Sequence, residues 1–338
     1  METKTMVVKH TSKKRILKII LSIFLAFFVL YTILDIFFDG LSVGHFSSIE
    51  GKQEYYNAYD EAMASMPSPT NTYDIETSWG IVRVYEWKND KNESETPILL
   101  LPGHSSGTPM WKINLPGFSK EHTVYSIDVL GDTGKSTQLV PFKTIDDVTG
   151  WLNEVIENMN IGDVHLVGHS FGGGYVADYA AAYPKHVQSL TLLEPAFALN
   201  SPSASVLFWA TVSSMEFLPK AWRDKGLAKM TGEDLSEVTA ASEDPLTRMI
   251  SAAAVYYSAS LPTPATLKAE QINKLDMPVY VALGDHSPIT GEKAKKNAAL
   301  IPDGTVKVWE NTTHSLPMEV PDELASELNE FWRKSQST

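Results

Sequence analysis

The stretch Asp163-Val164-His165-Leu166-Val167-Gly168-His169-Ser170-Phe171-Gly172 decides the fold of this chain. Its first five residues predict a buried strand, and the small residues after Gly172 predict a tightly packed helix. A serine on so sharp a strand-to-helix turn projects its hydroxyl at the top of a sheet, and the flanking glycines permit the strained backbone. The alternative is a glycine-rich turn whose serine merely caps the helix. We predict that Ser170 is a nucleophile.

Composition narrows the class of protein. The 338 residues, 43% of them hydrophobic, can form one large domain with an appendage or two modest domains. A net charge of -13 without a basic stripe argues against nucleic acid as a partner. The absence of cysteine excludes disulfides, thiolate catalysis and cysteine metal sites. No phosphate-binding loop, dinucleotide motif or metal-ligand cluster is visible, so we expect no cofactor and no metal.

The N-terminus predicts a membrane anchor. Residues 1–15 form a basic tail, and the next 23 residues, 16–38, are almost entirely apolar. At about 1.5 Å per residue this run crosses roughly 30 Å of hydrocarbon, and its basic flank is expected to stay inside the cell. The domain would then lie on the extracytoplasmic side. The alternative is a signal peptide cleaved near Ser42-Val43-Gly44, which would release a secreted protein.

The rest of the chain predicts an α/β fold. Residues 39–72 read as a linker and a helix around 53–66, and strands then alternate with helices over 73–196 and 271–335. Residues 197–270 interrupt the alternation with helical stretches and no convincing strand, which predicts a helical cap. Apolar strands between helices indicate a mostly parallel sheet with helices on both faces. The expected elements are a hairpin over 73–87, strands at 98–101, 123–128, 187–193, 277–283 and 306–309, and helices at 110–119, 145–159 and 321–334.

From about residue 73 to 334 the chain resembles the α/β-hydrolases that carry a helical cap. Together, four features make the resemblance specific. They are the nucleophile elbow at 168–172, the loop 99–107 in the place of the family's His-Gly loop, the turn 128–136, similar to the family's Asp-x-x-Gly-x-Gly-x-Ser turn, and His314 followed by Pro317, Glu319 and Pro321-Asp322-Glu323.

A serine hydroxyl needs a base within hydrogen-bond reach. His314 is the best candidate, because it follows Ser170 in a polar loop between a late strand and the last helix. His169 is expected to point away on the turn, and His165 to be structural within its strand.

The acidic member of the triad stays open. The resemblance implies a carboxylate after the strand before the histidine, in a pattern like Gly-x-x-Asp-Pro, but residues 284–288 place Ser287 there. Glu194 directly follows the preceding strand, and some family members carry their acid at that point. We predict Glu194, with Asp285 as the alternative. Both satisfy the chain order serine, acid, histidine.

The oxyanion hole is expected at the backbone amides of His104 and Phe171. The family's usual histidine before the loop glycine is Pro102 here, which removes a side chain but no donor.

These residues predict a serine hydrolase acting on a carboxylic ester with an apolar or acyl group. One alternative is an aminopeptidase or amidase, whose amine would need carboxylates such as Glu216, Glu233, Asp234 or Glu237. The other is a ligand-sensing or scaffold relative without turnover. Apolar cap residues would line the acyl pocket or form the cap's own core: Phe197, Leu207, Phe208, Trp209, Met215, Phe217, Leu218, Trp222, Met230, Met249, Tyr256 and Tyr257.

Overall fold

The computed structural model describes residue 15, residues 42–88 and residues 95–336. Apart from Arg15, the predicted basic tail and anchor therefore lie outside the described residues. Within the described ranges, no helix has both the length and the apolar character needed to cross a membrane. The described residues from Val43 onward form one compact unit.

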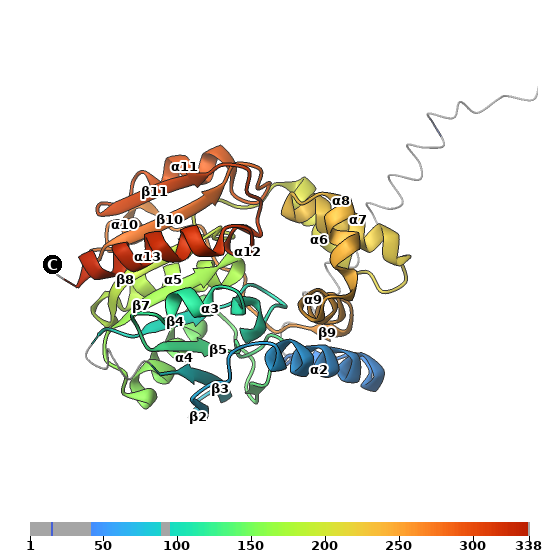
Figure 1. Cartoon of the computed structure of the whole chain (residues 1–338), viewed down its shortest axis with the longest axis horizontal. Helices are drawn as coiled ribbons and strands as arrows, with labels where there is room; N and C mark the ends of the chain where they lie inside the picture. The colour runs from blue at the N-terminus through green and yellow to red at the C-terminus, as the bar shows by residue number, and fades with distance from the viewer. Residues whose placement is uncertain (1–14, 16–41, 89–94, 337–338) are drawn as a thin grey trace, which may run out of the picture. The chain divides into compact units, whose positions relative to one another are not determined.

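A large sheet forms the centre of this unit (Figure 1). Its strands in the described chain are β2 (Asn71–Thr77), β3 (Gly80–Trp87), β4 (Ile98–Leu101), β5 (Val124–Ile127), β6 (Thr137–Gln138), β7 (Val164–His169), β8 (Val187–Leu193), β10 (Val279–Gly284) and β11 (Gly304–Trp309). Their order is β11-β10-β8-β7-β4-β5-β3-β2, with β6 beside β3. All neighbours from β11 to β5 are parallel, and β3 is antiparallel to β2, β5 and β6. The prediction of a mostly parallel sheet is confirmed.

Helices cover both faces of the sheet. Because successive strand residues point to opposite faces, Leu99 and Leu101 of β4 join one buried cluster and Ile98 and Leu100 join the other. The first cluster includes side chains of α4 (Ile145–Met159) and α5 (Ser170–Ala182). The second includes side chains of α3 (Leu115–Phe118) and α13 (Pro321–Ser335). Burial on both faces explains why these strands are continuously apolar.

The cap helices gather to one side of the sheet (Figure 1). They are α6 (Ala204–Ser214), α7 (Lys220–Thr231), α8 (Leu235–Ala240) and α9 (Pro245–Tyr256). The N-terminal helix α2 (Ile49–Ala64) packs against α9, and β1 (His45–Phe46) pairs with β9 (Tyr257–Ser258). Helix α2 begins earlier than predicted because Ser48 caps it, accepting the Gly51 N–H at 2.9 Å.

Two stretches differ from the sequence prediction. The single helix expected over 110–119 is wrong: a 3₁₀ turn (Thr108–Trp111) is followed by the short α3. Pro109 and Pro116 explain the break, since proline suits a first helical turn but interrupts a longer helix. Short helices were not foreseen where apolar periodicity is weak, at Pro184–His186, Ala241–Glu243, α10 (Ala269–Ile272), α11 (Gly291–Ala298) and α12 (Leu316–Glu319).

Candidate active site

Ser170 lies on the sharp turn from β7 into α5. Its φ is +52°, in the left-handed region that costs energy for a residue with a Cβ. A Cβ at Gly172 would lie 2.3 Å from the Pro102 carbonyl oxygen, and one at Gly168 would lie 2.5 Å from the Gly172 carbonyl oxygen. The two glycines are therefore required by close backbone approach, and they allow the serine to be held against the loop after β4.

His314 lies in the loop between β11 and α12, and its side chain is buried. Its Nε2 is 2.8 Å from Ser170 Oγ, and its Nδ1 is 3.2 Å from Glu194 Oε2. Because an ionised carboxylate can only accept, the Nδ1 nitrogen carries a proton and Nε2 is left to accept one from the serine hydroxyl. The structure thus joins the three residues into one hydrogen-bond chain.

Glu194 directly follows β8 with φ +48° and is completely buried. Its Oε1 accepts the Gly284 N–H at 2.5 Å and the Thr290 hydroxyl at 3.0 Å. Its Oε2 accepts the Ser287 hydroxyl at 2.5 Å, besides facing His314. A buried carboxylate with this many donors is compensated in its ionised form. Sequence reasoning missed these supporting donors, although it noted Ser287 at the position where the family's acid is expected.

Asp285, the alternative acid, does not reach the histidine. It is exposed, and its Oδ1 accepts the Thr312 N–H at 3.2 Å. Desolvation acts to raise the pKa of Asp285, but the N–H groups of Asn311 and Thr312 outweigh it and hold the pKa below its ordinary value. Of the two candidate acids, the structure brings Glu194 to His314.

His169 has a place in the site that the sequence did not suggest. Its ring centroid is 4.9 Å from that of His314, and its Nε2–H donates to the His314 carbonyl oxygen at 2.9 Å. Burial, with the neighbouring His314, lowers the pKa of His169 to about 3, so the ring is neutral at physiological pH. It fixes the backbone of the histidine loop.

The loop after β4 approaches the serine from the opposite side. A Cβ at Gly103 would lie 3.2 Å from Ser170 Cβ. The next residue, His104, has its ring 5.5 Å from that of Phe171. Neither the His104 nor the Phe171 backbone N–H has a hydrogen-bond acceptor within the described part of the chain. Among the described residues, nothing therefore competes with a substrate oxygen for these two expected donors.

The cap touches the histidine loop directly. The Thr231 carbonyl at the end of α7 accepts the His314 N–H at 2.9 Å. The next carboxylate along the chain, Glu233, accepts hydrogen bonds from the hydroxyls of Ser315 and Thr231. Sequence reasoning considered Glu233 only as a possible partner for a substrate amine, and no local pattern signals this contact.

The apolar cap residues divide into several groups. Phe197 packs edge-on against Phe171 at 5.8 Å and so lies beside the candidate site. Met249 is completely buried between α9 and α2, as expected for the cap's own core. Four others are exposed on the cap surface: Leu207, Phe208, Phe217 and Trp222.

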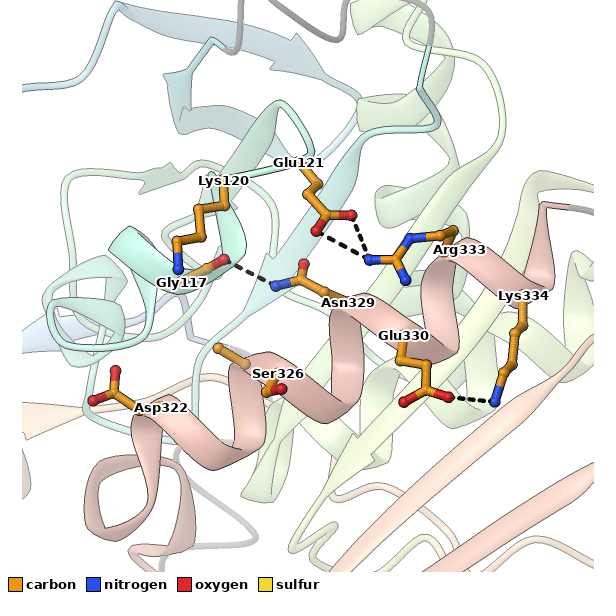
Figure 2. A pocket seen from close by; sticks show the side chains of 10 residues that line it. Gly117, Lys120, Glu121, Asp322, Ser326, Asn329, Glu330, Arg333 and Lys334 are labelled. Atoms are coloured by element: carbon orange, nitrogen blue, oxygen red, sulfur yellow. Dashed lines mark hydrogen bonds and ion pairs between the residues drawn. The ribbon is translucent and has the colours of Figure 1, made fainter.

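A separate groove of about 820 Å³ lies between α3 and α13 (Figure 2). It is lined mostly by polar and charged side chains, and Ser170, His314, Glu194, His104 and Phe171 are not among its lining residues. Figure 2 shows Arg333 paired with Glu121 and Lys334 paired with Glu330. The nitrogen–oxygen distances of these two ion pairs are 2.9 and 2.6 Å. This groove is therefore not the candidate active site.

Comparison with known proteins shows the family of this chain. Residues 98–327 match the Alpha/beta hydrolase family, and the chain belongs to that family. This confirms the resemblance to the α/β-hydrolases.

Among individual proteins, the chain is similar to carboxylesterase YbfK of Bacillus subtilis, with 22% identity over 85% of this chain and 96% of that one. The crystal structure of naproxen esterase from Bacillus subtilis superposes with a TM-score of 0.74 at 22% identity, covering 84% of this chain and 99% of the esterase. The structure of a bacterial membrane phospholipase A gives a TM-score of 0.67 at 18% identity, covering 97% of this chain and 100% of that one. At these identities, the solved structures establish a common fold.

Proposed function

We propose that this chain is a serine hydrolase that cleaves carboxylic esters with Ser170, His314 and Glu194. The observation that carries the proposal is the hydrogen-bond chain from Ser170 Oγ to His314 Nε2, 2.8 Å, and from His314 Nδ1 to Glu194, 3.2 Å. A serine hydroxyl is a weak nucleophile at neutral pH, and a base at this distance activates it. The same constellation performs acyl transfer on several unrelated folds.

In the proposed reaction, Ser170 Oγ attacks the ester carbonyl carbon while His314 Nε2 takes the hydroxyl proton. The carbonyl electron pair moves onto its oxygen, which the N–H groups of His104 and Phe171 stabilise. Collapse of this intermediate expels the alcohol, which receives the proton from His314 and leaves an acyl group on Ser170. Water, activated by the same nitrogen, then releases the acid. Glu194 stabilises the imidazolium formed in both halves.

An ester with an apolar or acyl group suits the site better than a peptide amine. Phe171 and Phe197 provide aromatic surface beside the serine. Glu233, one of the carboxylates that an aminopeptidase could use, is engaged by Ser315 and Thr231. The names of the relatives, a carboxylesterase and a naproxen esterase, support the same substrate class.

The membrane location is part of the proposal. The apolar run 16–38 and its basic flank support an anchor with the hydrolase domain on the outer side of the cell membrane. Cell fractionation and protease treatment of intact cells expressing the full chain test it. A full-length, carbonate-resistant, protease-accessible membrane protein is expected, whereas a shortened soluble product outside the cell would indicate a cleaved signal peptide.

The activity is tested with full-length protein in detergent and a series of p-nitrophenyl esters, with the matching p-nitroanilides as comparison. Wild type should turn over esters much faster than anilides, and Ser170→Ala should be inert. Equal inactivity of both proteins toward esters, and toward an acylating fluorophosphonate, would instead favour a sensing or scaffold role.

A further inference from the structure

The loop that carries the His104 amide has a strained backbone. The strain lies at Ser105, whose φ of +64° is in the left-handed region that is unfavourable for a residue with a Cβ, whereas Gly107 adopts its φ of +56° without that cost. Such backbone persists only where surrounding contacts hold it, and an oxyanion donor acts only when it is aimed at the developing charge. The contacts that hold this loop therefore bear on the proposed reaction.

Asp132 supplies two of those contacts through one oxygen. Its Oδ2 accepts the Ser105 N–H at 2.9 Å and the His104 Nδ1–H at 2.9 Å. Its Oδ1 accepts the N–H of Thr133 at 2.7 Å, and the whole residue is buried. The carboxylate thus binds both the side chain of His104 and the peptide that follows it.

These two hydrogen bonds fix His104 from two directions. The Ser105 N–H belongs to the peptide plane after the His104 Cα, and the imidazole leaves from the same Cα. With both held, the Cα and the preceding N–H have little freedom to turn. Partial burial acts to lower the pKa of His104, but the Asp132 carboxylate outweighs it and raises the pKa, which favours a charge-assisted hydrogen bond.

The turn that carries Asp132 is itself anchored. In the same turn, the buried Asp128 accepts the Thr108 N–H at 2.9 Å and the Tyr59 hydroxyl at 2.7 Å. The hydrogen bond from Thr108 therefore attaches the other end of the loop after β4 to this turn as well. The hydrogen bond from Tyr59 attaches the turn to α2.

We propose that Asp132 is a positioning residue that aims the His104 N–H at the oxyanion through paired hydrogen bonds to His104 and Ser105. The inference rests on the proposed function and adds a determinant of its rate. Because the oxyanion is absent from the bound ester and develops on the way to the tetrahedral intermediate, loss of Asp132 should lower kcat far more than it changes KM.

The test variant is Asp132→Asn in the full-length protein. Both oxygens of Asp132 accept a backbone N–H, so an amide in the same space must turn its NH₂ group toward one of them. We expect kcat to fall about 10- to 100-fold, less than the roughly 10²- to 10³-fold loss for deleting an oxyanion donor. His104→Phe keeps the backbone N–H and a ring but removes the Nδ1 bond, and a loss of about 3- to 10-fold is expected.

Glu86→Gln is the matched control. Glu86 is also a buried carboxylate with several donors, accepting from Asn71, Tyr73 and Tyr125 in the β2–β3–β5 region. Its loss is expected to affect stability without a specific effect on transition-state binding. Thermal unfolding of every variant separates loss of fold from loss of positioning.

The decisive readout compares two inhibitors with the same acyl chain. Ser170 Oγ adds to the carbonyl carbon of a trifluoromethyl ketone, and the resulting oxyanion lies in the oxyanion hole. A methyl ketone binds mainly without this addition and so mimics the bound substrate. Asp132→Asn should raise the inhibition constant of the trifluoromethyl ketone by about the same factor as it lowers kcat/KM. The inhibition constant of the methyl ketone should stay within about threefold of its wild-type value.

The inference is overturned if Asp132→Asn weakens the binding of both ketones equally. It is also overturned if Asp132→Asn weakens the binding of the trifluoromethyl ketone no more than Glu86→Gln does. If Asp132→Asn does not fold, His104→Phe decides by the same comparison. A wild-type protein inert toward esters and fluorophosphonate would overturn the proposed function instead, so the two failures are distinguishable.

Discussion

Replacing Glu194 by glutamine has a specific expected effect on the triad, because the hydrogen bonds around Glu194 allow only one orientation of the new amide. Oε1 accepts the backbone N–H of Gly284, which cannot rotate away. The carbonyl oxygen of the glutamine must therefore occupy this position. Its NH₂ group then faces His314 Nδ1, at the place of Oε2.

This orientation reverses the tautomer of the histidine. An NH₂ group can only donate, so Nδ1 must accept and the ring proton moves to Nε2. Nε2 then points an N–H at Ser170 Oγ, 2.8 Å away, and cannot take the serine proton. The analogous change in a serine protease lowers kcat about 10⁴-fold. We expect a loss of about 10³- to 10⁴-fold for Glu194→Gln, equivalent to about 4–5.5 kcal/mol in the activation barrier.

The assay is kcat on a p-nitrophenyl ester, with Asp285→Asn as the matched control. Both variants replace one carboxylate by an amide, but the Asp285 carboxylate is exposed and accepts a backbone N–H from Thr312 instead of contacting the histidine. Asp285→Asn should stay within about threefold of wild type. More than a tenth of wild-type kcat in Glu194→Gln, or a larger loss in Asp285→Asn, would refute the reasoning.

Three further outcomes follow from the same structure. Burial raises the pKa of Asp178 from 3.8 to about 7, so the folded state binds the extra proton between these values and stability should fall as pH rises from about 4 to 7. Asp178→Asn should remove that slope and raise the free energy of unfolding at pH 8 by up to about 4 kcal/mol, measured by urea unfolding at pH 5 and pH 8. Glu233→Gln weakens the charged hydrogen bond from Ser315, worth about 1.5–3 kcal/mol, and should increase hydrogen exchange at the end of α7; unchanged exchange would contradict this role. The double variant Glu194→Ser/Ser287→Asp should have a kcat at least about tenfold higher than Glu194→Ser alone. The reason is that Ser287 Oγ lies 2.5 Å from the Glu194 carboxylate, so an aspartate at this position can take over the role of the acid. An unchanged kcat would show that position 287 cannot supply the acid.

Much of the fold could be predicted because burial leaves a regular pattern in the sequence. Helix α4 begins and ends where its apolar period predicts, and Thr144 and Asp147 form the capping box at its start. Strand β8 likewise has the predicted bounds. Helix α11, by contrast, buries only alanines, Ala294 and Ala298, so it leaves no comparable apolar signal.

The site was predictable only where local sequence carries the chemistry. Ser170 stands in a turn with a strict backbone requirement, and His314 follows a recognisable strand. The acid stayed open because β8 and β10 are neighbours, so the loops after both strands lie at one sheet edge. Contacts between distant segments, such as that between Ser315 and Glu233, leave no pattern in either segment.

The central claim is that Ser170 becomes acylated with His314 as its base. Intact-mass analysis and peptide mapping of the full-length protein, quenched during reaction with a fluorophosphonate or a slowly released acyl ester, test it most directly. The account predicts a single adduct on Ser170, absent in Ser170→Ala and formed much more slowly in His314→Ala. An adduct on another residue, or ester turnover that persists in Ser170→Ala, would contradict it.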